Sequence, residues 1–321
     1  MIGCGTNTFT DPDDYRTHVP GAEIALVQTG SEGFNVHVVW VNLPHLSLVR
    51  VDERAARVAF VSLRSRSAFI SFPLRSESPS FWNGVRLQQG EIAFHARGEQ
   101  FHQRSAGPAR WGLISLAPRD LAAYGKIVLG AGLVPPRTSR LLRPPRSVAS
   151  DVLCLHRQAC RLAEEKPDMI MHREVTRALE QELVSALING LSVGELRDHS
   201  KTRQRHAEIM VRFEHVLAAQ IGRQLPMSEL CDALGVSERT LRICCMEFLG
   251  CGPADYARLR RLNLARSALA RGAPPNASVA AIAREHGFTE LGRFATTYRE
   301  MFGELPSATL RRSHRHRVDQ V

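Results

Sequence analysis

Short apolar segments separated by turn residues fill most of the first 116 positions of the chain. They are rich in Val, Ile, Leu, Phe and Trp, and Gly, Pro, Asn or Ser stands in the turns between them. The predicted strands are Phe34–Asn42, Leu46–Asp52, Val58–Leu63, Ala68–Leu74, Val85–Gln88, Glu91–Ala96, Gln100–Ser105 and Trp111–Leu116. This spacing predicts an antiparallel barrel or jelly roll rather than alternating βαβ units.

Helical periodicity replaces this pattern from Pro118 onward. Two amphipathic helices are predicted at Ser147–Glu165 and Met169–Asn189. The second carries an apolar stripe made of Val175, Leu179, Leu183 and Leu187. The stripe fits equally well against the barrel or against a second copy of the chain, because it indicates only that something apolar lies opposite.

The stretch 191–205 is polar and aperiodic, and we expect a linker there. It separates an N-terminal domain at 1–190, with the barrel at 34–116 and helices at 118–189, from a C-terminal domain at 206–312. A basic tail follows at 313–321. The predicted fold class is α+β, an N-terminal antiparallel β-barrel with flanking helices followed by an all-α domain.

A weak internal repeat occupies the C-terminal domain. At an offset of 52 positions, Leu230, Gly235, Val236 and Ser237 correspond to Ile282, Gly287, Phe288 and Thr289. After one inserted residue, at an offset of 53, Leu241, Cys245, Leu249, Gly250 and Pro253 correspond to Phe294, Tyr298, Phe302, Gly303 and Pro306. Each half has a short helix, Gly, an apolar residue, Ser or Thr, and a second helix, which is typical of a helix-turn-helix.

The residues at each corner have a physical role. Gly235 and Gly287 fall where the first helices end, a position that often needs a left-handed backbone. Ser237 and Thr289 are predicted to cap the second helices by accepting hydrogen bonds from free N–H groups. The faces predicted to point inward carry Leu241, Cys244, Cys245 and Phe248 in the first unit and Leu291, Phe294, Tyr298 and Phe302 in the second.

The opposite faces of the two second helices hold the candidate DNA-binding residues. These are Arg239, Arg242, Ile243 and Met246 in the first unit and Gly292, Arg293, Thr296 and Arg299 in the second. Exposed arginines are usually no more than solvated side chains. The same corner occurring twice favours recognition helices, since arginine can donate two hydrogen bonds to guanine in the major groove.

A helix from Pro253 to Ala270 is predicted to join the two units. At 1.5 Å per residue it is about 25 Å long. Its apolar stripe consists of Tyr256, Leu259, Leu262 and Leu269, and it ends at Gly272 and Pro274–Pro275. A rod of this length can hold two recognition helices in successive major grooves, which repeat about every 34 Å.

The net positive charge of the chain is concentrated in its C-terminal part. A chain of 321 residues with 44% hydrophobic and 23% charged residues has room for two domains, and intrinsic disorder is excluded as its main state. Residues 201–321 contain 19 Lys and Arg against 12 Asp and Glu, a net of +7, and residues 1–200 contain 23 against 20, a net of +3. The excess points to a polyanionic partner for the C-terminal domain.

The first residues, the apolar stretches and the cysteines of the sequence indicate where in the cell the protein is located. The first twenty residues lack the charged and then apolar regions of an export signal, and no apolar stretch is long enough to span a bilayer. The seven cysteines are an odd number and contain no Cys-x-x-Cys pair, which is unlike a disulfide framework. We therefore expect a cytoplasmic protein without a membrane partner.

Candidate catalytic chemistry is sparse, so we expect no enzyme and no cofactor. The sequence contains no Gly-x-Ser-x-Gly, phosphate loop or dinucleotide fingerprint. His95 and His102 could face each other across a hairpin as metal ligands, but strand histidines are more often structural. The one His-x-His, at His314–His316, lies in the tail, and Cys244, Cys245 and Cys251 lack a fourth ligand at zinc spacing. No metal site is expected.

Several aromatic residues of the barrel could line a ligand pocket. They are Trp40, Phe72, Trp82 and Trp111, together with Arg50. Core packing explains the aromatics at least as well. The sequence therefore assigns no ligand contacts.

The segment Leu225–Arg312 resembles the DNA-binding domain of AraC/XylS transcription regulators. The resemblance rests on Ser-Glu-Arg-Thr-Leu at 237–241, Arg-Arg-Leu-Asn-Leu-Ala-Arg at 260–266, Ile-Ala-Arg-Glu-His-Gly-Phe at 282–288 and Phe-Gly-Glu-Leu-Pro-Ser at 302–307. The run Gly-Phe-Thr-Glu-Leu-Gly-Arg-Phe at 287–294 is similar to the branch that includes ethanolamine-operon regulators. Cys245 departs from the family, which usually has an aromatic residue there.

The resemblance implies that Arg239, Arg242 and Ile243 contact bases, and that the second unit contacts bases or phosphates through Gly292, Arg293 and Thr296. Ile243 can contact only a thymine methyl or nothing, and Gly292 offers only backbone, so the first recognition helix is expected to discriminate more. The family also implies a cupin-like N-terminal module that senses a small-molecule effector or forms a homodimer. Promoter DNA and RNA polymerase would be partners, and activation is favoured over repression. The effector stays open.

Two alternatives from other classes remain at this point. One is a metal-dependent cupin-type enzyme fused to a DNA-binding domain. The other is an architectural protein that binds DNA without sequence preference, which competition against random duplex would distinguish from a regulator.

Overall fold

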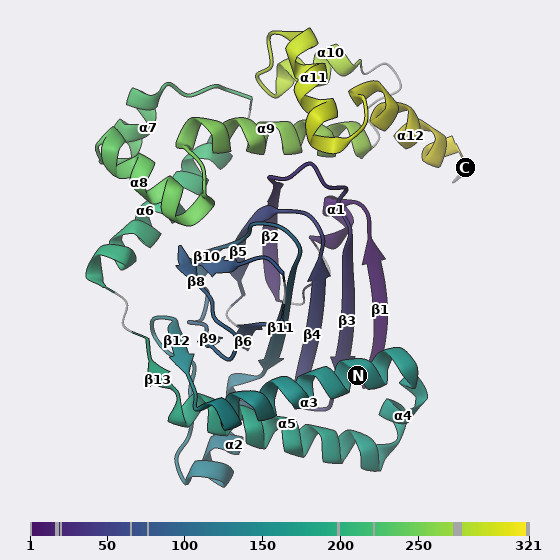
Figure 1. Cartoon of the computed structure of the whole chain (residues 1–321), viewed down its shortest axis with the longest axis vertical. Coiled ribbons are helices and arrows are strands. Elements are labelled where there is room, and N and C mark those ends of the chain that lie inside the picture. Colours follow the sequence, from purple (N-terminus) through teal and green to yellow (C-terminus); the bar gives the residue numbers. More distant parts are fainter. Residues whose placement is uncertain are drawn as a thin grey trace.

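The computed structural model describes residues 2–16, 19, 21–64, 66–75, 77–197, 200–220, 222–271 and 278–318, with side chains described up to residue 312. Within these residues, two antiparallel β-sheets make up most of the N-terminal part, and the C-terminal part is helical (Figure 1). The two parts contact each other along the smaller sheet.

The larger sheet has the strand order β1-β3-β4-β11-β6-β9-β12-β13. Its strands are β1 (Gly3–Phe9), β3 (Val36–Asn42), β4 (Leu46–Glu53), β6 (Ala68–Pro73), β9 (Ile92–Phe94), β11 (Ala109–Leu116), β12 (Arg140–Arg143) and β13 (Glu195–Leu196). Its neighbouring strands are antiparallel, and β11 lies between β4 and β6 with Leu113 opposite both Val49 and Ser71.

The smaller sheet has the order β2-β5-β10-β7-β8. Its strands are β2 (Ala22–Gln28), β5 (Arg57–Leu63), β7 (Ser80–Trp82), β8 (Val85–Arg86) and β10 (Gln100–Ser105), and a short helix α1 (Pro12–Tyr15) connects β1 to β2. Apolar side chains from both sheets form one core between them. We call this two-sheet unit the sandwich. The antiparallel prediction is confirmed, although the strands form two facing sheets and not one closed barrel.

The barrel limits predicted at 34–116 are too narrow. The sheets begin at β1 and also include β12 and β13, which pair with each other and join the larger sheet through β9. β1 has little hydrophobic signal because it is an edge strand, in which only Phe9 is buried. β12 and β13 are too short for periodicity to detect, and their pairing is long-range.

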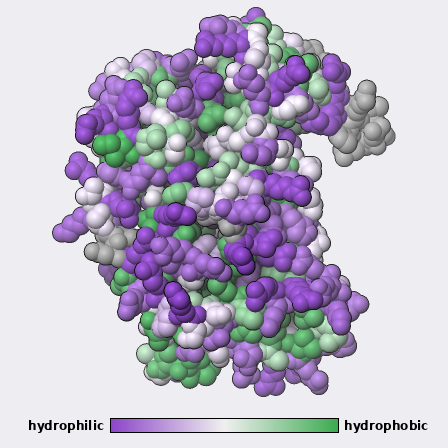
Figure 2. Space-filling view, viewed as in Figure 1, coloured by the Kyte–Doolittle hydropathy of each residue, from purple (hydrophilic) through white to green (hydrophobic). Residues whose placement is uncertain are grey.

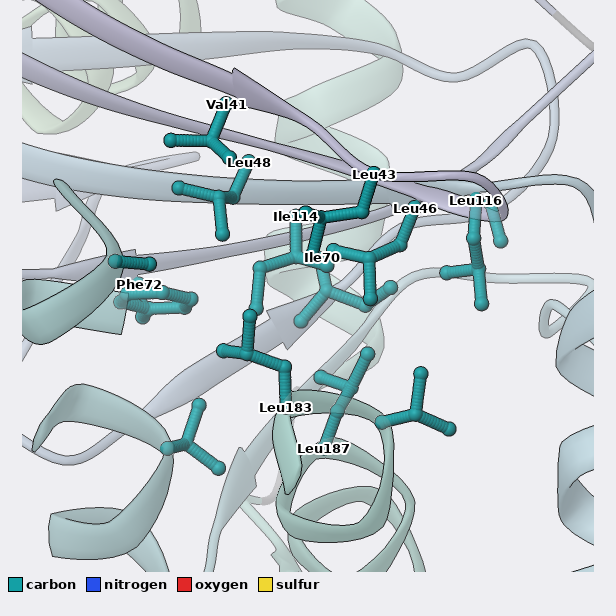
Figure 3. Close-up of a cluster of buried hydrophobic side chains, with 14 of the residues drawn as sticks. Val41, Leu43, Leu46, Leu48, Ile70, Phe72, Ile114, Leu116, Leu183 and Leu187 are labelled. Atoms are coloured by element: carbon teal, nitrogen blue, oxygen red, sulfur yellow. The ribbon is translucent and has the colours of Figure 1, made fainter. Parts of the chain in front are cut away.

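Helices cover the outer face of the larger sheet. They are α2 (Pro118–Leu129), α3 (Arg146–Glu165), α4 (Pro167–Met171) and α5 (Arg173–Val193), so the helix predicted from Met169 is divided at His172. Leu183 and Leu187 of α5 point toward Ile70 and Ile114 of the sheet (Figure 3). The stripe on α5 therefore packs on the chain's own sheet, and is not available as a seam between copies.

The C-terminal helices are α6 (Lys201–Ala219), α7 (Met227–Leu234), α8 (Glu238–Leu249), α9 (Pro253–Ala270), α10 (Val279–Glu285), α11 (Leu291–Phe302) and α12 (Pro306–Val318). The linker predicted at 191–205 is shorter, because α5 continues to Val193 and α6 begins at Lys201. The first residues of α6 are polar, so hydrophobic periodicity does not reveal where this helix begins. The sequence pattern places Arg203 and His206 in solvent, yet both side chains pair with Glu247 of α8, at 3.1 and 2.9 Å.

The predicted tail at 313–321 is not separate from the domain in backbone structure, since α12 continues through Val318. The side chains of His314 and His316 lie outside the described residues, as do Gly272 and Pro274–Pro275, which were expected to end the joining helix.

None of the described helices is long and apolar enough to cross a membrane. The visible surface is mainly hydrophilic, with hydrophobic groups gathered over α2, where Ile127 is exposed (Figure 2).

Candidate nucleic-acid interface

The first helix-turn-helix consists of α7 and α8. Gly235 follows α7 with φ +64°, a left-handed conformation that few other residues adopt at low cost. Ser237 is the N-cap of α8, and its Oγ accepts a hydrogen bond from the Thr240 N–H at 3.2 Å. Both predictions for this corner are confirmed, and the turn is set by local residues.

One face of α8 is buried and the other is exposed, as predicted. Leu241, Cys244, Cys245 and Phe248 are buried in a core shared with α6, α7 and α9. Cys245 lies in that core, to which Phe213 and Tyr256 also belong, so the position stays apolar without an aromatic residue. Burial raises the pKa of Cys244 to about 11, and the thiol stays protonated at neutral pH.

The exposed face of α8 carries Arg239, Arg242, Ile243 and Met246. Ile243 and Met246 are 46% and 56% exposed. Arg242 pairs with Glu238 one turn earlier at 2.6 Å, in the open, where such a pair contributes at most about 1 kcal/mol. Two large apolar side chains flanked by free or weakly held arginines make a surface suited to base edges, which combine methyl groups with hydrogen-bond acceptors.

The second helix-turn-helix consists of α10 and α11, and its turn differs from the first. Gly287 has φ +76°, as predicted. The prediction that Thr289 caps α11 is wrong: the helix begins at Leu291, the N-cap residue is Glu290, and no side chain accepts a capping hydrogen bond. The residue inserted between the two repeats lies in this turn, so the position equivalent to Ser237 is 53 residues later, at Glu290.

The exposed face of α11 carries the predicted set Gly292, Arg293, Thr296 and Arg299. The inward side has Phe294 and Tyr298 fully buried, with Leu291 and Phe302 partly buried against the same core. A methyl group added at Gly292 would meet no atom within 4 Å, so packing within the chain does not require glycine there. The surface of α11 is therefore open at Gly292.

α9 holds the two units together as one rod. Its first half contributes Tyr256 and Leu259 to the core of the first unit, and its second half contributes Leu262 and Leu269 to the core of the second. With 18 residues it is about 27 Å long. Arg261 also donates to the Gly287 carbonyl at 3.0 Å, which ties the second turn to α9.

The first unit also packs on the smaller sheet of the sandwich. Val27 and Val58 belong to the same core as α6 and α8. The side chain of Asn263 on α9 bonds both backbone groups of Gln28 on edge strand β2, accepting from its N–H at 3.0 Å and donating to its carbonyl at 3.2 Å. Asn263 thereby covers an edge that would otherwise be free to pair with another chain.

A buried polar cluster lies at this contact. Glu214 of α6 accepts hydrogen bonds from His102 of β10 at 3.1 Å and from the hydroxyl of Tyr256 at 2.5 Å, and Arg260 lies at 3.5 Å. Burial alone would raise the pKa of Glu214, but the hydrogen bond and charge of His102, followed by Tyr256 and Arg260, lower it below its usual value. The carboxylate is therefore held ionised between the two parts of the chain.

The pair of histidines considered as metal ligands is not brought together. His95 points between the sheets, where it bonds Ser71 at 2.8 Å and Glu99 at 2.9 Å, whereas His102 points outward to Glu214. Across the described part of the chain, no group of three or more His, Cys, Asp or Glu residues could hold a metal ion.

A cavity lies between the two sheets of the sandwich, and it includes two of the aromatics considered above, Trp82 and Trp111. Arg50 instead pairs with Asp52 and Glu164 at the surface. Phe72 packs on the helix side, and Trp40 is not part of the cavity wall. Sequence reasoning missed the polar members of the wall, Glu53, Arg57 and Tyr15 among them, because no local motif marks them.

A family model described as "Helix-turn-helix domain" matches residues 230–312. The chain is 35% identical over 101 residues to the XylDLEGF operon transcriptional activator 2 of Pseudomonas putida, covering 30% of this chain and 64% of that protein. It is 34% identical over 124 residues to the XylDLEGF operon transcriptional activator 3 of the same organism, covering 37% of each. The crystal structure of a probable AraC family transcriptional regulator from Rhodopseudomonas palustris CGA009 is 35% identical with a TM-score of 0.31, covering 33% of this chain and 97% of that one.

The chain thus spans less than two thirds of the length of these Pseudomonas putida relatives. The family model falls on α7 to α12, which contain both helix-turn-helix units. The similarity of the second unit to ethanolamine-operon regulators stays a prediction. Residues 230–312 thus carry a helix-turn-helix domain that is similar to those of AraC/XylS transcriptional regulators.

Proposed function

We propose that this chain is a sequence-specific DNA-binding transcription activator that responds to a small-molecule effector through its N-terminal sandwich. The observation that carries the proposal is the pair of helices α8 and α11. Each buries one face in its own core, and each exposes an opposite face with arginines and small or apolar residues. The shared rod α9 sets the spacing of the two helices.

The exposed residues fit direct reading of base edges. Arg239 and Arg242 would donate to guanine, and Ile243 with Met246 would contact thymine methyl groups. Arg293, Thr296 and Arg299 on α11 would hold bases or phosphates, with Gly292 allowing close approach. The first helix would discriminate more strongly between sequences, because it presents both hydrogen-bonding and methyl-contacting side chains.

The position of β10 supports a response to an effector. Side chains alternate along a strand, so neighbouring residues point to opposite faces. Phe101 and Gln103 line the cavity between the sheets, while His102 between them bonds Glu214 of α6. A molecule that enters the cavity and shifts β10 would therefore also shift the contact with α6, which shares a core with the first helix-turn-helix.

Double-stranded promoter DNA is the partner we propose for α8 and α11, and RNA polymerase is the partner that activation would require. The cytoplasm is the proposed location. A homodimer would need a surface other than the apolar stripe of α5, because Leu183 and Leu187 are covered by the sheet.

The structure does not favour a metal-dependent enzyme, because the two histidines considered as ligands point apart: His95 points between the sheets to Ser71, and His102 points outward to Glu214. The architectural alternative is tested by competition. Fragments selected by the full chain from a random duplex pool are titrated at physiological salt against unselected duplex. We expect the selected sites to bind at least about 1,000-fold more tightly. Equal affinity for both pools would overturn the proposal.

A further inference from the structure

The cavity of the sandwich is apolar along most of its wall. Ile24, Leu26, Val61, Leu63, Phe101 and Leu113 all line it, and they come from both sheets. Its volume is about 40 Å³. A cavity with this lining favours the apolar part of a ligand.

Three buried polar atoms on the cavity wall have no hydrogen-bond partner among the described residues. They are the Tyr15 hydroxyl, Oε1 of Glu53 and Nε1 of Trp111, in side chains that are 1%, 4% and 7% exposed. An unsatisfied buried donor or acceptor is costly, and native proteins contain few of them. Three in one cavity indicate a place where another molecule supplies the missing partners.

The three atoms gather at one end of the cavity. In the ladder of β4 and β11, Glu53 stands opposite Ala109, and Trp111 is the next residue on the same face. Burial, followed by the nearby Glu53 carboxylate, raises the pKa of Tyr15 well above its usual value, so its phenol keeps its proton. This end thus offers one acceptor, Glu53, one donor, Trp111, and a neutral hydroxyl that can do either.

Charge at this end is already balanced. Arg57 pairs with Glu53 at 2.8 Å, and its remaining contacts are to the backbone carbonyl and the side-chain oxygen of Gln103, at 2.8 and 3.1 Å. The guanidinium therefore has no free positive charge to offer. A ligand carboxylate would meet the Glu53 carboxylate as a like charge in a low-dielectric site, which is strongly unfavourable.

We propose that the cavity selects an uncharged, largely apolar molecule bearing a hydroxyl or primary amide, and that it rejects carboxylates. The ligand's polar group donates to Glu53 and accepts from Trp111, with Tyr15 beside both. This inference rests on the proposed function, because it names the chemical class of the effector.

The small size of the cavity limits which ligands can enter it without movement of the wall. About 40 Å³ holds roughly three water molecules. A ring-sized ligand fits only if the wall moves. Phe101 on β10 is part of that wall, and β10 carries His102 on its other side, so ligand entry and the contact to α6 are coupled.

The test compares phenol, toluene and benzoate on the full chain by calorimetry and by tryptophan fluorescence, since Trp82 and Trp111 line the cavity. Phenol has the required hydroxyl, toluene lacks it, and benzoate is an anion. We expect phenol to bind at least tenfold more tightly than toluene, and benzoate not to bind. Benzoate or toluene binding as tightly as phenol, or no binding of phenol, would overturn the inference.

Variants locate the site. Tyr15→Phe and Trp111→Phe should each weaken phenol binding about tenfold, whereas Trp40→Phe, outside the cavity wall, should leave it unchanged. Glu53→Gln removes the charge that balances Arg57, so it should reverse the preference toward benzoate. Where Glu53→Gln does not fold, judged by circular dichroism, the two aromatic variants carry the test. Equal phenol affinity in all variants contradicts the assignment.

The same preparations are assayed for binding to selected and unselected DNA. Failure of phenol binding with sequence preference intact overturns only the ligand class. Loss of sequence preference overturns the proposed function, whatever the result with phenol.

Discussion

His102 on β10 donates a hydrogen bond to Glu214 on α6 at 3.1 Å, and both side chains are buried. The two residues are 112 positions apart and belong to the two different parts of the chain. Nδ1 of His102 has no partner among the described residues, so the bond to Glu214 is the polar contact that holds this ring. The pair therefore connects the wall of the cavity with α6, which shares a core with the first helix-turn-helix.

Replacing His102 by Ala should destabilise the chain by about 3–5 kcal/mol, because it leaves the Glu214 carboxylate buried with a weakened set of partners. Chemical denaturation of the full chain measures the effect. His45→Ala is the control, since His45 is a half-exposed histidine that pairs with Asp120 at 3.6 Å, and its loss should cost under about 0.5 kcal/mol. Similar small losses for both variants would show that the pair contributes little.

Stability should fall between about pH 6.5 and pH 4 because of His156. Burial lowers the pKa of this histidine to about 4, and its Nε2 donates to the Val49 carbonyl at 3.1 Å. The folded chain keeps His156 neutral in this range while the unfolded chain takes up a proton, so acid favours unfolding.

A shift from 6.5 to about 4 corresponds to about 3 kcal/mol of stability present at neutral pH and lost by pH 4. Denaturation midpoints measured at pH 7, 6, 5 and 4 test this for the wild type and for His156→Gln. The variant should lose most of the slope in that window. An unchanged slope would assign it to other groups.

The corrected cap predicts a contrast between two matched substitutions. Ser237→Ala removes the oxygen that accepts the Thr240 N–H and should cost about 1 kcal/mol. Thr289→Ala removes no cap, because α11 begins after Glu290, and should be nearly neutral. Thermal or denaturant unfolding of both variants decides the matter. Comparable losses would restore Thr289 as a cap.

Arg242→Ala should weaken binding to the selected DNA site by about 1–3 kcal/mol and relax the preference at one base position. Arg177→Ala, which removes an exposed arginine from α5, is the matched control and should change nothing. Titration against a set of single-base variants of the site provides the measurement. A uniform loss on every sequence would mean that Arg242 holds phosphate only.

Leu183→Ala should destabilise the chain by about 2–5 kcal/mol, because Leu183 is buried between α5 and the larger sheet. Its oligomeric state, measured by sedimentation, should not change. A changed oligomeric state at unchanged stability would mean that the stripe on α5 contacts a second copy instead.

The C-terminal interface was largely predictable because its determinants are local. Gly235, Ser237 and the alternating faces of α8 all lie within about four helical turns of one another, where i, i+3 and i+4 spacing decides which side chains share a face. The one error, at Thr289, came from the position of a single inserted residue. The change of offset from 52 to 53 shows that the second repeat has one extra residue, but only the observed start of α11 shows that this residue lies in the turn before Leu291.

The strands were predicted as elements, but their pairing was not. β11 lies between β4 and β6, and β12 joins the larger sheet through β9 although about 46 residues separate them. Alternation along a strand indicates that two faces exist, without indicating which strand lies beside it. The short strands β7, β8 and β13 carry too few residues for any periodic signal.

By itself, the sequence determined that the chain has two helix-turn-helix units on one rod and which faces of their second helices point outward, because these features depend on neighbours in sequence. Only the tertiary structure decided that Glu53, Tyr15 and Trp111 meet in one cavity and that His102 meets Glu214. Those residues come from separate elements, and only the packing of two sheets and the docking of α6 bring their side chains within contact distance.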